Sequence, residues 1–133
     1  MRSQEIDYKI IGEEMQYVEI ELDPNETAMS EAGSFMMMDD GVQMETIFGD
    51  GSQQEGAGLL DKLFSAGKRV LVGAGMFMTG YTNVGSGKKR VSFAAPYPGK
   101  IIPLDLAKLG GKVICQKSAF LCAAKGVAIG LEF

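Results

Sequence analysis

The sequence predicts an all-β protein, and two observations carry that prediction. The chain has 133 residues, of which 18 are glycine and 46% are hydrophobic. Its apolar runs are short, and Gly, Asn, Asp or Pro separates one run from the next. This pattern is typical of many short strands joined by tight turns. Because the length is that of one domain with its own core, we expect a single domain over residues 1–133.

Strands are predicted where apolar side chains fall on one face or on both faces of an extended segment. The clearest case is residues 17–22, where Val18, Ile20 and Leu22 alternate with glutamates and a Pro-containing turn follows. The other predicted strands are residues 5–11, 34–38, 42–46, 75–79, 91–94, 102–106, 112–116, 119–123 and 127–131.

One short helix is predicted near residues 58–67. Leucines 59, 60 and 63 and Phe64 have helical spacing, and Gly67 is a suitable stop. We expect this helix to pack on the β-body as an amphipathic lid; the alternative is a contact with a membrane surface or a partner groove.

Five methionines lie in predicted strands that are apolar on both faces, so both faces must be covered. These residues are Met36, Met37, Met38, Met76 and Met78. Flexible methionine side chains fill cores and also form adaptable contacts. We therefore predict that they contribute to the core and to an oligomer interface, in preference to a ligand-binding methionine patch.

The charges are strongly segregated along the chain. The net charge is −4, but residues 1–61 hold 15 acidic and 2 basic residues, while residues 62–133 hold 2 acidic and 11 basic ones. We expect the two halves to pack together and neutralise one another, within or between subunits. The alternative is a polyanion partner at Lys88, Lys89 and Arg90, a candidate anion-binding segment. The acidic pI near 4.8 argues against nucleic acid.

Catalytic and cofactor chemistry has little support. The chain has no histidine, so the usual base of Ser or Cys hydrolases and the usual metal ligands of cupin-type enzymes are missing. Asp39 and Asp40 precede a glycine and are expected to form a solvated turn. Cys115 and Cys122 lie in apolar runs and are expected to be buried, inert thiols. We predict a protein that is not an enzyme and binds no cofactor or metal.

The sequence also bears on location. The N-terminus lacks the apolar region of a secretory signal. No apolar stretch is long enough to cross a bilayer, because charged or polar residues interrupt each one. With two cysteines, no disulfide framework is expected, so a reducing compartment is the simpler assumption. These features predict a cytoplasmic protein without a transmembrane segment.

An internal repeat is visible when residues 18–44 are laid over residues 102–129. Val-Glu-Ile-Glu-Leu then falls on Ile-Pro-Leu-Asp-Leu, and Ser-Phe-Met falls on Ala-Phe-Leu. A weaker third copy places Phe77 between Phe35 and Phe120, at a period near 42 residues. Strand pairs that recur at a fixed period predict a double-stranded β-helix body.

Several motifs resemble those of the altered-inheritance-of-mitochondria family, a mostly bacterial family of unknown function with some mitochondrial members. The motifs lie in order across nearly the whole chain, at residues 33–36, 76–79, 95–104 and 116–123. The run Pro-Gly-Lys-Ile-Ile-Pro-Leu at 98–104 is the most specific.

The resemblance implies a β-fold similar to that of the tryptophan-regulated RNA-binding attenuation protein, and a homo-oligomer. It transfers no catalytic residues. Many members continue beyond the position of Phe133, so the chain corresponds either to a short member or to part of a longer one. The function expected on these grounds is a non-catalytic oligomeric β-scaffold or binding module. The alternative is a ring that binds RNA or a small ligand.

Overall fold

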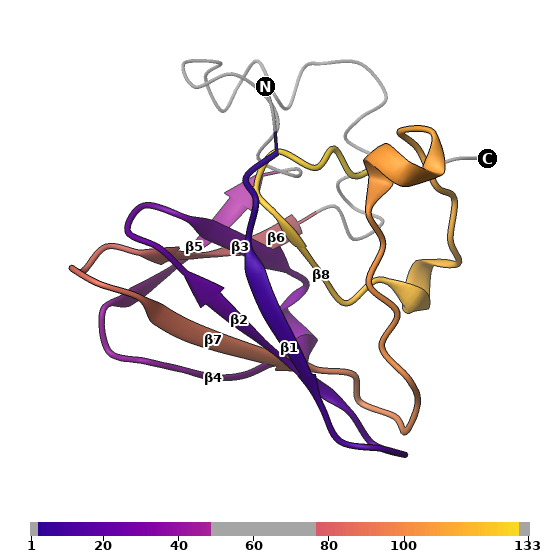
Figure 1. Cartoon of the computed structure of the whole chain (residues 1–133), viewed down its shortest axis with the longest axis horizontal. Coiled ribbons are helices and arrows are strands. Elements are labelled where there is room, and N and C mark those ends of the chain that lie inside the picture. Colours follow the sequence, from indigo (N-terminus) through magenta and orange to yellow (C-terminus); the bar gives the residue numbers. More distant parts are fainter. Residues whose placement is uncertain (1–2, 49–76, 131–133) are drawn as a thin grey trace.

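The strands form two four-stranded antiparallel sheets, as the computed structural model of the chain shows for residues 3–48 and 77–130 (Figure 1). In spatial order, the first sheet contains β1 (Asp7–Ile11), β2 (Tyr17–Leu22), β7 (Lys89–Ala94) and β4 (Phe35–Met38). In spatial order, the second sheet contains β5 (Val42–Phe48), β6 (Phe77–Asn83), β3 (Thr27–Ser30) and β8 (Cys122–Ala124). The all-β prediction is confirmed; the finer prediction of a double-stranded β-helix, or of a fold like that of the attenuation protein, stays a prediction.

Strand β2 forms where the alternation predicts it. It pairs with β1 on one side and with β7 on the other. Val18, Ile20 and Leu22 are buried, whereas Glu19 and Glu21 on the opposite face are half-buried. Each fully buried aliphatic side chain contributes about 1.5–3 kcal/mol, so this strand supplies a large part of the core.

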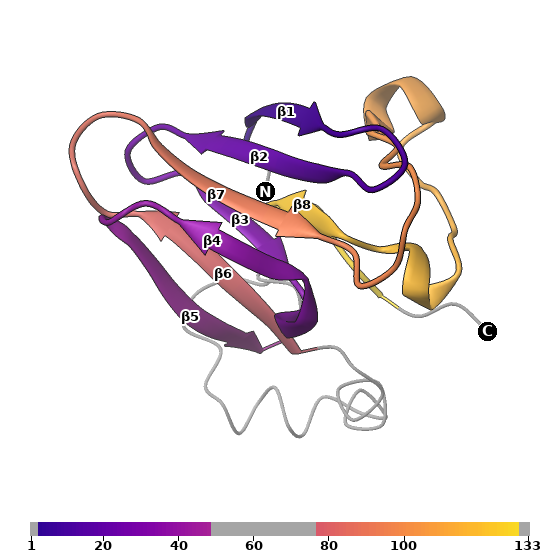
Figure 2. The same cartoon turned by 90° about the horizontal axis from the view of Figure 1, so that it is seen from below.

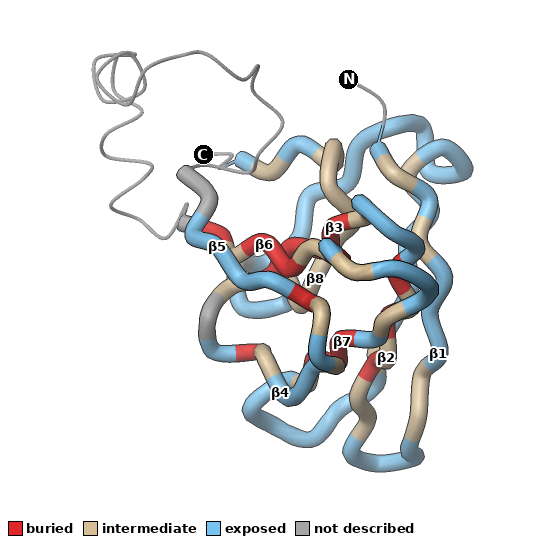
Figure 3. Tube along the Cα trace, turned by 90° about the vertical axis from the view of Figure 1, so that its left-hand side faces the viewer, coloured by how far each residue is buried: buried red, intermediate tan, exposed pale blue. Residues whose placement is uncertain are grey.

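The core lies between the sheets and is built around Tyr81. Its ring stacks on Phe35 at a centroid distance of 5.3 Å and meets Phe93 edge-on at 5.1 Å. Figure 3 shows the buried residues gathered on β2, β3, β6 and β7. The sheets therefore pack through aromatic contacts as well as aliphatic ones. The buried cluster contains Val18, Ile20, Leu22, Ala28, Val42, Tyr81, Val91 and Phe93.

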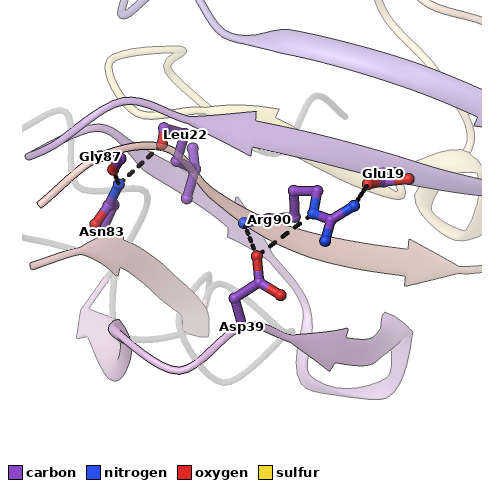
Figure 4. A network of polar contacts seen from close by, with 6 residues as sticks. All are labelled: Glu19, Leu22, Asp39, Asn83, Gly87 and Arg90. Carbon is purple, nitrogen blue, oxygen red and sulfur yellow. Dashed lines mark hydrogen bonds and ion pairs between the residues drawn. The ribbon is translucent and has the colours of Figure 1, made fainter. Parts of the chain in front are cut away.

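Asn83 ties the two sheets together at one end. Its buried side-chain amide donates to the carbonyl oxygens of Leu22 (2.9 Å) and Gly87 (2.8 Å) (Figure 4). Its Oδ1 accepts from the Gly85 backbone N–H (3.0 Å). Since Leu22 ends β2, Asn83 ends β6 and Gly87 precedes β7, one side chain joins both sheets to the turn between β6 and β7. Both N–H groups and the oxygen of this side chain are hydrogen-bonded, and two of the three bonds depend on the turn being closed.

Strand β3 was not predicted. Its residues Thr27–Ser30 are all buried, because β3 lies between β6 and β8 and both of its faces are covered. A short strand of this kind shows no alternation of apolar and polar residues, which is the signal that sequence analysis depends on.

The predictions for the C-terminal third were largely wrong. Residues 102–106, 112–116 and 127–130 pair with no described strand. Strand β8 (Cys122–Ala124) overlaps only the end of the strand predicted at 119–123. Two 3₁₀ turns, η2 (Leu106–Leu109) and η3 (Lys117–Ala119), occur there. The apolar alternation is present, but an extended segment becomes a strand only when a neighbour accepts its hydrogen bonds.

Three further predictions are not tested by the described residues. The helix predicted at 58–67 lies outside the described residues. The single domain and the internal repeat stay predictions. Within residues 3–48 and 77–130, no helix has the length and apolar character needed to cross a membrane.

We predict that Asn83→Ala destabilises the fold by about 3 kcal/mol, because three backbone groups each lose a hydrogen bond in a largely buried setting. Urea denaturation followed by circular dichroism measures the change. Ser86→Ala, in the exposed part of the same turn, is the control and is expected to change stability by less than about 0.5 kcal/mol. Equal effects of the two substitutions would contradict the role assigned to Asn83.

Candidate functional site

Three of the predicted interface methionines are consecutive in the sequence and exposed. Met36, Met37 and Met38 lie on β4, at the edge of the first sheet, and are 45%, 50% and 37% exposed. The register of β4 against β7 shifts between Phe35 and Met37, so Met36 lies in a bulge. These apolar side chains lie along one sheet edge, Met38 on its core-facing side and Met37 on the opposite side, and such an exposed edge is suited to a partner.

The remaining methionines are arranged differently. Met78 lies on β6 and is 2% exposed, so it belongs to the interior, and Met76 lies outside the described residues. Met44, which was not among the predicted interface residues, is 45% exposed on β5. Strands β4 and β5 are the edges of their sheets on the same side of the molecule (Figure 2). We call the surface formed by Met36, Met37, Met38 and Met44 the open edge.

The basic segment Lys88, Lys89 and Arg90 faces acidic side chains of the N-terminal half. Arg90 pairs with Glu19 at 3.1 Å and with Asp39 at 3.4 Å (Figure 4), and Lys88 lies 3.8 Å from Asp23. The hydrogen bond and the negative charge of Asp39, followed by those of Glu19, raise the pKa of Arg90 above its usual value. These contacts agree with the expectation that the two halves neutralise one another, here within one chain.

Asp39 and Asp40 differ in their surroundings. Asp40 is exposed in the turn, as predicted, but Asp39 is half-buried and its Oδ2 accepts from the Arg90 backbone N–H at 2.8 Å. The following Gly41 has φ +99°, and a Cβ there would lie 3.0 Å from Cε of Lys89. The Asp-Asp-Gly turn therefore packs closely against the first residues of β7. No set of three or more acidic or cysteine side chains within the described ranges is arranged to hold a metal ion.

The two cysteines have unlike environments. Cys115 is exposed, so the prediction that it is buried was wrong; it lies in the segment where no strand forms. Cys122 lies on β8 and is half-buried, and burial raises the pKa of its thiol to about 12. A thiol in that state stays protonated at neutral pH and is a poor nucleophile.

A groove of about 460 Å³ was not predicted. It lies between three segments that are far apart in the sequence: residues 31–34, residues 95–97 and residues 116–121. The Ser34 hydroxyl helps to hold its wall, because it lies within hydrogen-bonding distance of the carbonyl oxygens of Glu31 (3.0 Å) and Leu121 (3.3 Å). The family motifs at 33–36, 95–104 and 116–123 all contribute residues to this groove. Those motifs were visible in the sequence, but their convergence depends on the fold.

These features define an all-β protein of two antiparallel sheets with an exposed apolar edge and a shallow groove. A family model described as mitochondrial biogenesis AIM24 matches residues 8–133, so the chain belongs to that family. The resemblance drawn from the motifs is thereby confirmed.

No curated protein matches the chain. A crystal structure of a protein from Streptococcus pyogenes is similar at 21% identity with a TM-score of 0.48, over 74% of this chain and 41% of that one. The chain thus spans less than half the length of that protein.

We predict that Cys115 reacts with a thiol reagent in the native protein whereas Cys122 does not. At about pH 8 a thiol with a pKa of about 12 is thiolate in only about one molecule in ten thousand, and partial burial also limits access. Titration with an aromatic disulfide is expected to detect Cys115 first and Cys122 after addition of denaturant. In Cys115→Ser the native protein should not react; a fast native reaction of that variant would contradict the assignment.

Proposed function

We propose that this chain is a non-catalytic β-scaffold that self-associates and binds a partner through its exposed apolar surfaces. The observation that carries the proposal is the open edge, where three consecutive methionines of β4 are more than a third exposed. Methionine is common at adaptable protein contacts because its side chain is flexible and polarisable. Exposing such side chains on a sheet edge invites pairing with another chain.

The groove supports a binding role in addition. It combines the aromatic rings of Tyr97 and Phe120 with polar groups of Glu31, Gln116 and Ser118. Binding sites commonly combine an apolar lining with a few polar groups that orient a ligand. A non-catalytic role is part of the proposal, since the sequence supplies no histidine and Cys122, the half-buried thiol, stays protonated. A reducing compartment such as the cytoplasm is also part of it, since both cysteines are free.

A ring that binds RNA through Lys88, Lys89 and Arg90 has less support. Lys88 and Arg90 already face carboxylates, and each carboxylate reduces the attraction of that segment for phosphate. No contact of the described residues favours this alternative over the scaffold.

We predict that Met37→Asp weakens self-association at least about tenfold, because a charge placed in an apolar contact must lose its water. Light scattering and sedimentation equilibrium over a wide concentration range measure the effect. Tyr8→Asp is the matched control, since Tyr8 is also half-exposed but lies on β1, at the other side of the first sheet. The scaffold proposal fails if the unchanged protein is monomeric throughout.

A further inference from the structure

Residues 99–109, which we call the arm, begin as an extended segment anchored beside the turn between β1 and β2. The Gly99 N–H donates to the Glu14 carbonyl at 3.0 Å, and the Ile101 N–H donates to Oε1 of Gln16 at 2.7 Å. Gly99 forms a parallel bridge with Met15, and Ile101 packs against the core. One side of the arm is therefore attached to the body of the protein.

On the other side of the arm, the backbone of residues 102–104 forms no hydrogen bond with the part of the chain that the structure describes. In an extended chain, alternate residues direct their backbone N–H and C=O groups to opposite sides. Because the Ile101 N–H points to Gln16, the backbone groups of Ile102 and Leu104 point away from the body. Pro103 falls on the attached side. Its lack of an N–H therefore removes no hydrogen-bond donor from the side that points away from the body.

The side chains on the free part of the arm are also uncovered. Ile102 is 74% exposed and Leu104 is 48% exposed. No strand within the described ranges pairs with residues 102–106. The arm thus has the alternation, the extended backbone and the unpaired hydrogen-bonding groups of a strand that lacks its neighbour.

The open edge also lacks a neighbouring strand among the described residues. Strand β5 pairs with β6 over seven consecutive residues without a register shift, and it has no neighbour on its other side among the described strands. Met44 lies opposite the buried Tyr81, and Met38 lies opposite the buried Val91, so both methionines lie on the core-facing sides of their sheets. Both are nevertheless exposed, which means that the layer between the sheets is left uncovered at this edge.

The arm has a net positive charge, and the open edge is flanked by acidic side chains. The arm carries two lysines and one aspartate: the Lys100 ammonium donates to the Glu13 carbonyl on the attached side, the Asp105 carboxylate accepts from the Ala107 N–H, and Lys108 forms no ion pair within the described residues. The open edge is flanked by Asp40 and Glu45, which are exposed and likewise have no ion pair within those residues. Electrostatic complementarity of this kind guides association and sets its orientation.

We propose that the arm of one copy of this chain adds as a strand to the free edge of β5 in a second copy. Ile102 and Leu104 then cover Met38 and Met44, and Lys108 faces the acidic side chains beside the open edge. The proposal rests on the scaffold function above and deepens it by naming the two surfaces in contact. Because these surfaces differ, the contact is heterologous: it builds either a dimer in which two copies exchange arms or a ring or open chain of subunits.

The first test is Leu104→Pro, which removes an outward N–H of the arm. We expect it to raise the dissociation constant of self-association at least about tenfold, because strand addition depends on main-chain hydrogen bonds. Pro103→Ala is the matched control, because it changes the attached side and is expected to leave association unaltered. Circular dichroism establishes that each variant is folded, and Ile102→Asp provides a second arm variant if Leu104→Pro is not.

The decisive test mixes two variants that do not associate alone. Leu104→Pro keeps an intact open edge, while Met44→Lys keeps an intact arm but places a charge in the apolar contact with Ile102 and Leu104. Each is expected to sediment as a monomer, and an equimolar mixture is expected to form a heterodimer and nothing larger. This pattern arises only when two different surfaces meet.

Three results would overturn the proposal. If Met44→Lys and Met37→Asp prevent association but the folded arm variants do not, copies meet edge to edge; the scaffold function then survives and the arm contact does not. A mixture that stays monomeric also excludes the arm contact. If the unchanged protein is monomeric at every concentration, both proposals fail and another partner must cover the arm.

Discussion

The buried amide of Asn83 is the contact on which the arrangement of the two sheets depends. It accepts and donates hydrogen bonds that join the end of β2, the end of β6 and the turn leading to β7. With that turn closed, β7 can lie between β2 and β4 while β6 lies between β3 and β5. Tyr81, two residues before Asn83, is thereby placed between Phe35 and Phe93. A single satisfied polar group thus aligns the aromatic packing of the core.

The same strand order decides which surfaces are available. Because β4 and β5 follow one another in the chain yet end different sheets, both become edges on one side of the molecule. Their methionines are then exposed although two of them face the interior layer. The arm exposes apolar side chains in an unpaired extended segment elsewhere on the chain. The proposed association between copies rests on these two uncovered features of one chain.

The charge distribution is explained in part by contacts within the chain. Arg90 lies between Glu19 and Asp39, which brings residues of the acidic and basic halves together across the first sheet. The arm lysines and the acidic side chains near β5 are not paired in this way within the described residues. Opposite charges thus form ion pairs within the first sheet, while those of the arm and of the β5 edge are the ones that the proposed contact between copies would use.

Local pattern was sufficient for the all-β class, for β2 and its buried face, and for the motifs that identify the family. These properties depend on neighbouring residues in the sequence, since alternation reports which face of a strand is buried. The tertiary structure alone decided the rest. Residues 102–106 alternate apolar and other side chains as a strand does, yet they pair with no described strand. Thr27–Ser30 pair with two strands although their sequence shows no alternation of apolar and polar residues. Pairing, the exposure of Met36 to Met38 and the convergence of three motifs at one groove all depend on partners distant in sequence, which no local pattern encodes.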